Sequence, residues 1–184
     1  MNEIASKGQL NAALGRWALA IIPVVLLLGL GSGLVAGSGE ENRWYQMLQR
    51  PAIQPPGWAF GVVWPILYVL MGLAAAMVAA ARGARWRGVA LSAFAVQLAL
   101  NLCWSPLFFG MHQVSAAFWL LLLILAAAGV TTWLFARVRV VAAWLLVPYL
   151  AWLCFASLLA FETDRLNPDG ETIQAPAGAQ RIAI

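Results

Sequence analysis

Residues for acid-base, nucleophilic or metal chemistry are scarce in this sequence of 184 residues, and aromatic residues are abundant. The chain has one histidine, His112, and two cysteines that lie singly within apolar runs. No pattern typical of a zinc protease, a nucleotide-binding loop or a serine hydrolase is present, and no metal site is indicated. There are ten tryptophans. Because an indole ring has an apolar body and donates one hydrogen bond, these tryptophans are expected either at membrane interfaces or in aromatic pockets.

The first aromatic stretch covers residues 43–68 and contains four prolines, at positions 51, 55, 56 and 65. Proline fixes its own backbone and restricts the residue before it, so this stretch is stiff. A stiff aromatic loop at the mouth of a helix is suited to covering a cavity. It is equally suited to anchoring the helix in the membrane interface. The aromatic and polar residues of interest here are Arg43, Trp44, Tyr45, Arg50, Trp58, Phe60, Trp64 and Tyr68.

The second stretch, residues 99–110, places four side chains on one face of a helix. Asn101, Trp104, Ser105 and Phe108 have the spacing i, i+3, i+4 and i+7. An asparagine in an apolar helix needs a hydrogen-bond partner, which is either a neighbouring helix or a ligand. Both alternatives place this face inside a bundle.

The third stretch, residues 147–157, has the same character. Tyr149, Trp152 and Ala156 follow one another at i, i+3 and i+7, and the small Ala156 leaves room beside a large ring. Pro148 is expected to bend this helix. The face is suited to a binding site and also to ordinary helix packing.

The elements that position these stretches are predicted from composition. Hydrophobic residues make up 63% of the chain and charged residues 10%, whereas soluble domains have roughly 25% charged residues. Since a span needs about 20 apolar residues, the charge-free intervals predict an all-α membrane protein, a bundle of five transmembrane helices. A cleaved signal peptide is disfavoured because the first apolar run is too long. The predicted helices are 17–37, 58–81, 88–109, 115–136 and 140–163.

This pattern divides the chain into three parts. Residues 1–16 form a polar N-terminal segment, residues 17–166 the membrane domain with loop 38–57 as a lid, and residues 167–184 a disordered tail. The glycines at 29, 33 and 37 recur every four residues and allow close helix approach.

The distribution of charge excludes some functions. The net charge is +4, but the basic residues are scattered singly, so nucleic acid is not an expected partner. The acidic residues lie near the termini or at positions 40–41, and no internal repeat is visible, which disfavours ion-coupled transport. The basic residues predict an inside N-terminus and an outside C-terminus. One side would carry Lys7, Arg16, Arg82, Arg85, Arg87, Arg137 and Arg139, and the other Arg43, Arg50, Arg165 and Arg181.

Taken in order, the three stretches resemble the TspO/MBR family of translocator proteins, also called peripheral-type benzodiazepine receptors. The resemblance runs from about residue 20 to 166. It is carried by Trp44-Tyr45, Arg50-Pro51, Pro55 to Gly61, Trp64, Leu67-Tyr68, Met71-Gly72, Asn101, Trp104, Phe108 to Gly110, Pro148 to Trp152 and Phe155-Ala156.

The resemblance implies a five-helix bundle, often dimeric, with one cavity under the first loop. Family ligands include protoporphyrin IX, other tetrapyrroles, sterols and synthetic benzodiazepines, and no cofactor is required. In some bacterial relatives, light-dependent porphyrin breakdown is attributed to tryptophans that match Trp64 and Trp152. The implied binding residues are Trp44, Tyr45, Pro55, Pro56, Phe60, Trp64, Tyr68, Asn101, Trp104, Ser105, Phe108, Tyr149, Trp152, Phe155 and Ala156.

One part of the family pattern is altered. The sterol-recognition segment of animal relatives has Leu, then Tyr, then Arg or Lys, and here it reads Leu159, Phe161 and Arg165. Phe161 lacks the hydroxyl, and such motifs are weak even when intact, so tight cholesterol binding is not expected.

The predicted function is binding of porphyrins and related hydrophobic molecules by a multi-pass protein of a bacterial cell membrane, in tetrapyrrole or oxidative-stress sensing. Membrane lipid and a second copy of the chain are the expected partners. Two alternatives remain. One is light-dependent porphyrin degradation, with pocket tryptophans as electron donors, and the other is transport of tetrapyrrole or lipid.

Overall fold

Five long helices dominate the computed structural model, which describes residues 7–173. The part of the chain it describes contains no strand, and each long helix is apolar and long enough to cross a membrane. The predicted all-α architecture with five spans is therefore confirmed. The long helices are α1 (Lys7–Val35), α3 (Gly57–Ala80), α4 (Arg87–Ser105), α5 (Val114–Val138) and α6 (Val140–Leu166).

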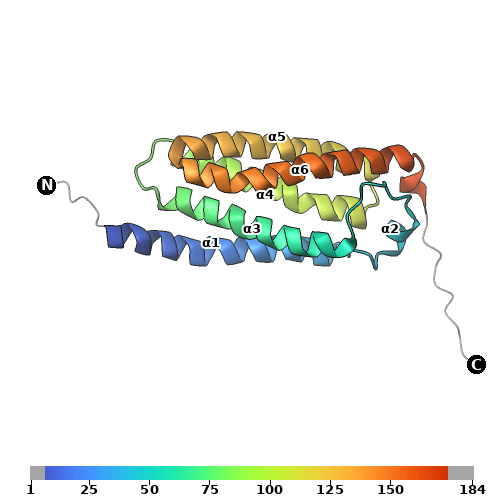
Figure 1. The fold of residues 1–184 in the computed structure, drawn as a ribbon, viewed down its shortest axis with the longest axis horizontal. Helices are drawn as coiled ribbons and strands as arrows, with labels where there is room; N and C mark the ends of the chain where they lie inside the picture. Colours follow the sequence, from blue (N-terminus) through green and yellow to red (C-terminus); the bar gives the residue numbers. More distant parts are fainter. Residues whose placement is uncertain (1–6, 174–184) are drawn as a thin grey trace, which may run out of the picture.

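The helices alternate in direction and form a closed ring (Figure 1). α1 packs on α3 and α4, α3 packs on α6, α6 on α5, and α5 on α4. The N-terminus and the connections α3–α4 and α5–α6 lie at one end of the bundle. The connection between α1 and α3 and the C-terminal end of α6 lie at the other end (Figure 1).

Two helix boundaries differ from the sequence prediction. α1 begins at Lys7 rather than near residue 17, because no proline interrupts residues 7–16 and the run Ala12-Ala13-Leu14 has high helix propensity. α4 continues as a π-helix over Pro106–Gly110. Pro106 has no N–H to donate to the Leu102 carbonyl, and the Ser32 hydroxyl of α1 donates to that carbonyl instead, at 2.6 Å. The proline therefore ties α4 to α1 without leaving an unpaired backbone group in the membrane.

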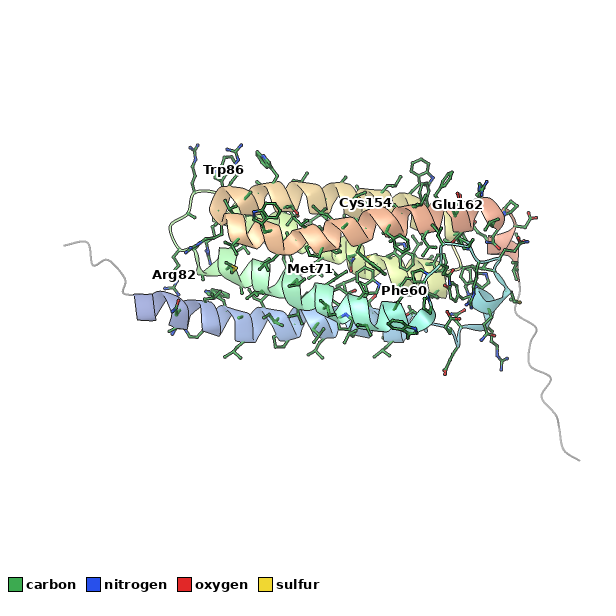
Figure 2. All side chains as sticks on the ribbon, viewed as in Figure 1. Phe60, Met71, Arg82, Trp86, Cys154 and Glu162 are labelled. Carbon is green, nitrogen blue, oxygen red and sulfur yellow. The ribbon has the colours of Figure 1, made fainter. Side chains whose placement is uncertain are left out.

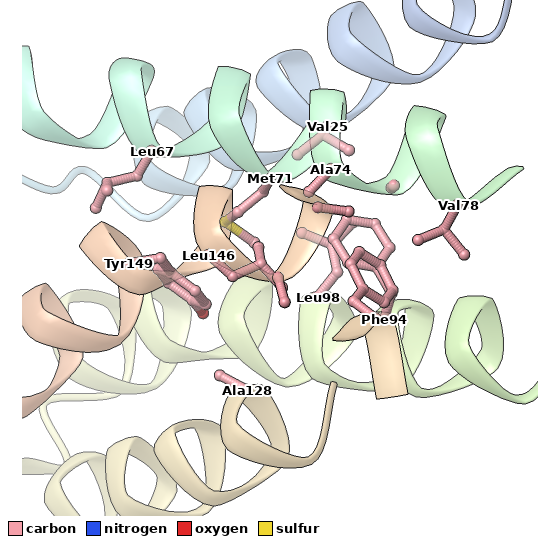
Figure 3. Packing of buried hydrophobic residues seen from close by; sticks show 14 of the residues in the cluster. Val25, Leu67, Met71, Ala74, Val78, Phe94, Leu98, Ala128, Leu146 and Tyr149 are labelled. Atoms are coloured by element: carbon pink, nitrogen blue, oxygen red, sulfur yellow. The ribbon is translucent and has the colours of Figure 1, made fainter. Parts of the chain in front are cut away.

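Buried apolar side chains from the five long helices pack into one core, part of which Figure 3 shows. Small residues on α3 let its neighbours come close, and Gly72 is the clearest case. A Cβ at position 72 would lie 2.8 Å from the Ile22 Cα of α1. Core side chains from all five helices include Val25, Met71, Val78, Phe94, Leu98, Ile124, Phe135 and Leu146.

The lid, residues 38–57, contains the short helix α2 (Arg43–Met47). Asn42 caps α2, since its Oδ1 accepts a hydrogen bond from the Tyr45 N–H at 3.0 Å. The chain leaves α1 through Gly37 at φ 62° and Gly39 at φ 128°, a left-handed conformation that glycine adopts easily. Gly37 thus belongs to this turn and not to the helix-packing series predicted with Gly29 and Gly33.

The segment that follows α6 is ordered as far as the structure describes it. Residues 167–173 include the short 3-10 helix η2 (Gly170–Thr172) and pack against the lid. These residues were predicted to belong to a disordered tail, and the hydrogen bonds that hold them connect segments more than 100 residues apart. Residues 174–184, the rest of the predicted tail, and residues 1–6 lie outside the described part.

Candidate ligand-binding cavity

A cavity of about 510 Å³ lies inside the ring of helices beneath the lid. This volume falls within the range of roughly 300–1,000 Å³ that is typical of small-molecule sites. Figure 2 shows Phe60, one of its lining residues, at this end of the bundle. The cavity brings together these predicted residues: Tyr45, Phe60, Trp64, Tyr68, Asn101, Trp104, Ser105, Phe108, Trp152, Ala156 and Leu159.

The walls from α3 and α6 are aromatic. Trp64 stacks on Tyr68 with ring centroids 5.4 Å apart, and Phe60 meets Trp152 edge to face at 5.7 Å. The Nε1–H of Trp152 is buried and has no partner among the described residues. Because a buried donor without a partner is costly, a ligand with an acceptor atom beside Trp152 would relieve this cost.

The wall from α4 is a rigid aromatic stack. The rings of Trp104 and Phe108 are nearly parallel, with centroids 5.0 Å apart. Trp104 is held in place because its Nε1–H donates to the Ala117 carbonyl of α5 at 3.1 Å. The predicted face of α4 is therefore real, and the π-helix lets Phe108 lie beside Trp104 on the side facing the cavity.

A chain of hydrogen bonds runs from the cavity into the core. The Tyr68 hydroxyl donates to Asn101 Oδ1 at 3.3 Å, and Asn101 Nδ2 donates to the Tyr149 hydroxyl at 3.0 Å. Tyr149 in turn donates to Gln97 Oε1 at 3.1 Å. The partner of Asn101, left open by the sequence, is thus two tyrosines on neighbouring helices. Since the Tyr68 proton points to Asn101, the Tyr68 oxygen can offer the cavity only an acceptor.

Polar residues of the lid gather at the mouth of the cavity. Glu40 and Arg50 form an ion pair at 2.6 Å, and the Arg50 guanidinium lies 5.0 Å from the centre of the Tyr45 ring. Gln54 Nε2 donates to the Tyr45 hydroxyl at 2.7 Å. Burial raises the pKa of Tyr45 above its ordinary value of 10.0, and Glu40 adds to this shift while Arg50 and Gln54 oppose it. Tyr45 is therefore a neutral phenol at the cavity mouth under physiological conditions.

Trp44 lies on the other side of the lid and does not line the cavity. It is 2% exposed, stacks on His112 at 4.4 Å, and donates its Nε1–H to the Gly170 carbonyl at 2.9 Å. The structure thus separates the two neighbouring lid residues. Tyr45 faces the cavity, and Trp44 fixes α2 to the segment after α6.

Several other predicted residues lie near the cavity but outside it. Pro55 and Phe155 line a shallow apolar groove on the outer surface between α3 and α6, and Trp152 lines both this groove and the cavity. Pro56 is the N-cap of α3. Of the predicted sterol segment, Phe161 is exposed and contacts Phe118, and Arg165 pairs with Glu162 at 2.6 Å.

Sequence reasoning missed the contributions of α1 and α5 to the cavity. Gly29 and Gly33 of α1 line it, and a Cβ at position 29 would overlap the ring of Tyr68. The four-residue glycine spacing was the signal for this close approach. No comparable signal marked the apolar residues of α5 or the polar residues of the mouth. The main additions are Ser38, Glu40, Gln54, Phe109, Leu121, Ile124 and Thr163.

The lining of the cavity is suited to an organic molecule. Within residues 7–173, no group of histidine, cysteine and acidic side chains could hold a metal ion. Flat aromatic walls, one unused donor at Trp152 and one acceptor at Tyr68 suit a flat, mostly apolar molecule with few polar atoms.

Comparison with known proteins gives a consistent match. The model of the TspO/MBR family matches residues 20–166. The chain is 38% identical to a protein named "Tryptophan-rich sensory protein" from Cereibacter sphaeroides, over 82% of this chain and 92% of that protein. It is 32% identical to "Protein CrtK" of Rhodobacter capsulatus, over 85% and 98% of the two chains. It is 43% identical to the human "Translocator protein", over 70% and 78%.

Proposed function

This chain belongs to the TspO/MBR family, and from that premise we propose that its cavity binds porphyrins, with protoporphyrin IX as the representative ligand. The protein is an integral, multi-pass membrane protein, and apolar molecules of this kind dissolve in the bilayer that it spans. The observation that carries the proposal is the cavity of about 510 Å³ beneath the lid, with tryptophan, tyrosine and phenylalanine on its walls.

The shape of the cavity supports a planar ligand. Trp64 with Tyr68 and Trp104 with Phe108 form two stacked pairs on α3 and α4. Aromatic rings gain most from offset stacking or edge contacts with another ring system, which a porphyrin macrocycle supplies on both faces. The acceptor oxygen of Tyr68 is complementary to pyrrole N–H groups.

The mouth of the cavity supports recognition of the porphyrin propionates. Arg50 contacts two residues that line the cavity, since it pairs with Glu40 and lies over the Tyr45 ring. A ligand carboxylate would replace Glu40 on Arg50 and form a charge-assisted ion pair of the same type. Arg43, the other arginine of the lid, is exposed at the start of α2 and is less suited to this role.

Binding under a closed lid also supports a sensing role. Lid residues make up the mouth, so an occupied cavity and an empty one differ in what the lid contacts. The name "Tryptophan-rich sensory protein" of one relative agrees with this role. We propose that ligand occupancy, through the lid, reports tetrapyrrole levels or oxidative stress.

A titration of tryptophan fluorescence with protoporphyrin IX tests the binding proposal. The expected result is saturable quenching that weakens in a Trp64→Ala/Trp152→Ala double variant. A Trp119→Ala/Trp144→Ala double variant is the matched control, because both residues are exposed on the outer surface. Quenching that is not saturable, or that the cavity variant and the control lose equally, would overturn the proposal.

A second candidate function is light-dependent porphyrin degradation, favoured by the position of Trp64 and Trp152 on the cavity wall. The excited porphyrin would take an electron from Trp64 or Trp152 and pass it to dioxygen. The oxidised tryptophan would then recover an electron from the porphyrin, so that the net change is oxidation of the bound ring by dioxygen. The chemistry belongs largely to the ligand. If illuminated porphyrin bleaches at the same rate with wild type and Trp152→Phe protein, this candidate is excluded.

A further inference from the structure

The end of the bundle opposite the lid is strongly cationic. The connections α3–α4 and α5–α6 carry arginines, whereas the acidic residues of the described chain all belong to the lid or to the segment from Glu162 to Glu171. Both ion pairs of the described chain also lie at the lid end. The arginines at the opposite end are therefore without acidic partners among residues 7–173. They are Arg82, Arg85, Arg87, Arg137 and Arg139.

Two of these arginines are ordered by an indole pair. Trp86, at the start of α4, meets Trp133 of α5 edge to face, with centroids 6.3 Å apart and planes at 65°. The Arg85 guanidinium lies over the Trp86 ring at 5.8 Å, and that of Arg137 lies over Trp133 at 4.9 Å. We call these four residues the Trp-Arg cluster. Figure 2 shows Trp86 at the end of the bundle away from Phe60.

The Trp-Arg cluster offers hydrogen-bond donors and no acceptors of its own. A guanidinium that lies over an indole face keeps its N–H groups free to bind a second group. Neither indole N–H, nor either guanidinium, makes a hydrogen bond within the described residues, and Trp86 and Trp133 are 37% and 52% exposed. Arg87 differs, because its Nε–H donates to the Ala79 carbonyl at the end of α3, at 2.9 Å.

We propose that the Trp-Arg cluster binds the phosphate of an anionic phospholipid from the adjoining leaflet. Phosphate oxygens match the planar fork of arginine, and tryptophan favours the level of lipid headgroups. The cluster lies at the start of span Arg87–Gly110 and near the end of span Val114–Val138, so the indole bodies meet the lipid chain while the arginines meet the headgroup. A lipid satisfies both halves of the site, whereas a free phosphate satisfies only the polar half.

The site would join two connections that are far apart in the sequence. Residues 85–86 precede α4, and residues 133 and 137 lie near the end of α5. A phosphate shared by Arg85 and Arg137 would therefore fix α4 to α5 at the end away from the cavity. This role is independent of the ligand bound under the lid.

Native mass spectrometry of the full-length protein released from a neutral detergent tests the proposal. Bound phosphatidylglycerol is counted against phosphatidylcholine, for wild type and for an Arg85→Gln/Arg137→Gln variant. We expect wild type to prefer phosphatidylglycerol, and the variant to lose about fivefold in this preference for each arginine removed. The matched control is Arg82→Gln/Arg139→Gln, which removes the same charge at the same end but leaves both cation–π pairs intact.

The control defines what would overturn the site. Equal losses in the two double variants would mean that lipid preference follows overall charge, and the Trp-Arg cluster would not be a site. A Trp86→Leu/Trp133→Leu variant keeps every charge, and its preference for phosphatidylglycerol is expected to fall several-fold. The same fall is expected for Arg85→Lys/Arg137→Lys, which keeps the charge but removes the planar guanidinium. Competition by millimolar inorganic phosphate would show a free-anion site and would likewise contradict the proposal.

Discussion

The side chain of Asn167 forms two hydrogen bonds with the backbone of Gln49 in the lid. The Gln49 N–H donates to Asn167 Oδ1 at 2.8 Å, and Asn167 Nδ2 donates to the Gln49 carbonyl at 2.9 Å. Asn167 is 7% exposed and also donates to the Thr163 carbonyl of α6. Together with the bond from Trp44 to Gly170, this contact makes the end of α6 the anchor of the lid.

Removing this anchor is expected to loosen the lid. Asn167→Ala leaves the Gln49 peptide without its partners, which should destabilise the closed lid by about 1–3 kcal/mol. Trypsin can report the change, because the bond after Arg43 is a lid site whereas Pro51 blocks cleavage after Arg50. We expect faster cleavage after Arg43 in the variant. An Asp169→Ala protein, altered at an exposed neighbour, should be cut at the wild-type rate; equal cleavage of all three would refute the anchoring role.

The ion pair at the cavity mouth predicts which ligands bind tightly. Glu40→Gln frees Arg50 and removes a negative charge that repels an entering carboxylate. Since exposed ion pairs contribute about 0.2–1 kcal/mol, we expect up to about fivefold tighter binding of protoporphyrin IX. The dimethyl ester of the same porphyrin should bind both proteins equally.

The measurement for Glu40 is a fluorescence titration with both forms of the porphyrin. Glu41→Gln is the control, since Glu41 is exposed and is not part of the cavity or the ion pair. An equal gain for the acid and the ester would mean that Glu40 acts on lid closure and not on ligand charge.

The contact of Gly29 with Tyr68 predicts strong sensitivity to a single methyl group. In Gly29→Ala, the new Cβ overlaps the Tyr68 ring, so Tyr68 or α1 must move. Overpacking of this kind costs about 1–3 kcal/mol, and it also displaces a cavity wall. We expect a lower melting temperature in detergent and weaker ligand binding. Gly31 lies two residues further along α1, and a Cβ there would have nothing within 4 Å. Gly31→Ala should therefore lower neither the melting temperature nor the affinity for ligand.

The environment of Tyr45 predicts an alkaline limit for lid closure. Because burial raises its pKa, the phenol is less than half ionised at the pH where an exposed tyrosine, with an ordinary pKa of 10.0, is half ionised. The raised pKa means that the folded state favours the neutral form, so this contribution to stability is complete below pH about 10 and is lost as pH rises through the folded pKa.

Ultraviolet absorbance of the phenolate measures this directly. The spectrum of wild type minus that of Tyr45→Phe isolates one tyrosine of the three. A midpoint above 10 is expected, and a midpoint at or below 10 would contradict the partly buried position of Tyr45. Arg50→Gln should raise the midpoint further, because Arg50 opposes the shift.

The sequence predicted the parts of the fold that depend on local composition. Long charge-free runs can only be spans, because a charge in hydrocarbon is costly. The face of α4 with Asn101 and Trp104 was also predictable, since helical spacing places those residues together whatever surrounds them. Homodimerisation and the physiological ligand remain predictions.

The features that were not predictable depend on contacts between distant segments. Trp44 and Tyr45 are adjacent in sequence, yet contacts of Trp44 with His112 and with the segment after α6 hold it away from the cavity. That segment is polar and contains proline and glycine, the usual composition of a disordered tail, and its order comes from Asn167 and Gly170 meeting the lid. Local composition does not predict such contacts between distant segments.

Filling the cavity tests the central claim that the ligand binds inside the helix ring. Ala156 lines the cavity on α6, so Ala156→Phe places a ring in the space that a porphyrin would occupy. Leu158→Phe adds a similar ring to the lipid-facing side of the same helix, where Leu158 is 52% exposed. Protoporphyrin IX is titrated into both variants and wild type in lipid nanodiscs. The account predicts saturable one-to-one binding for wild type and Leu158→Phe and at least tenfold weaker binding for Ala156→Phe, about 1.4 kcal/mol. Equal affinity in all three proteins would mean that the ligand binds elsewhere, and would contradict binding inside the helix ring.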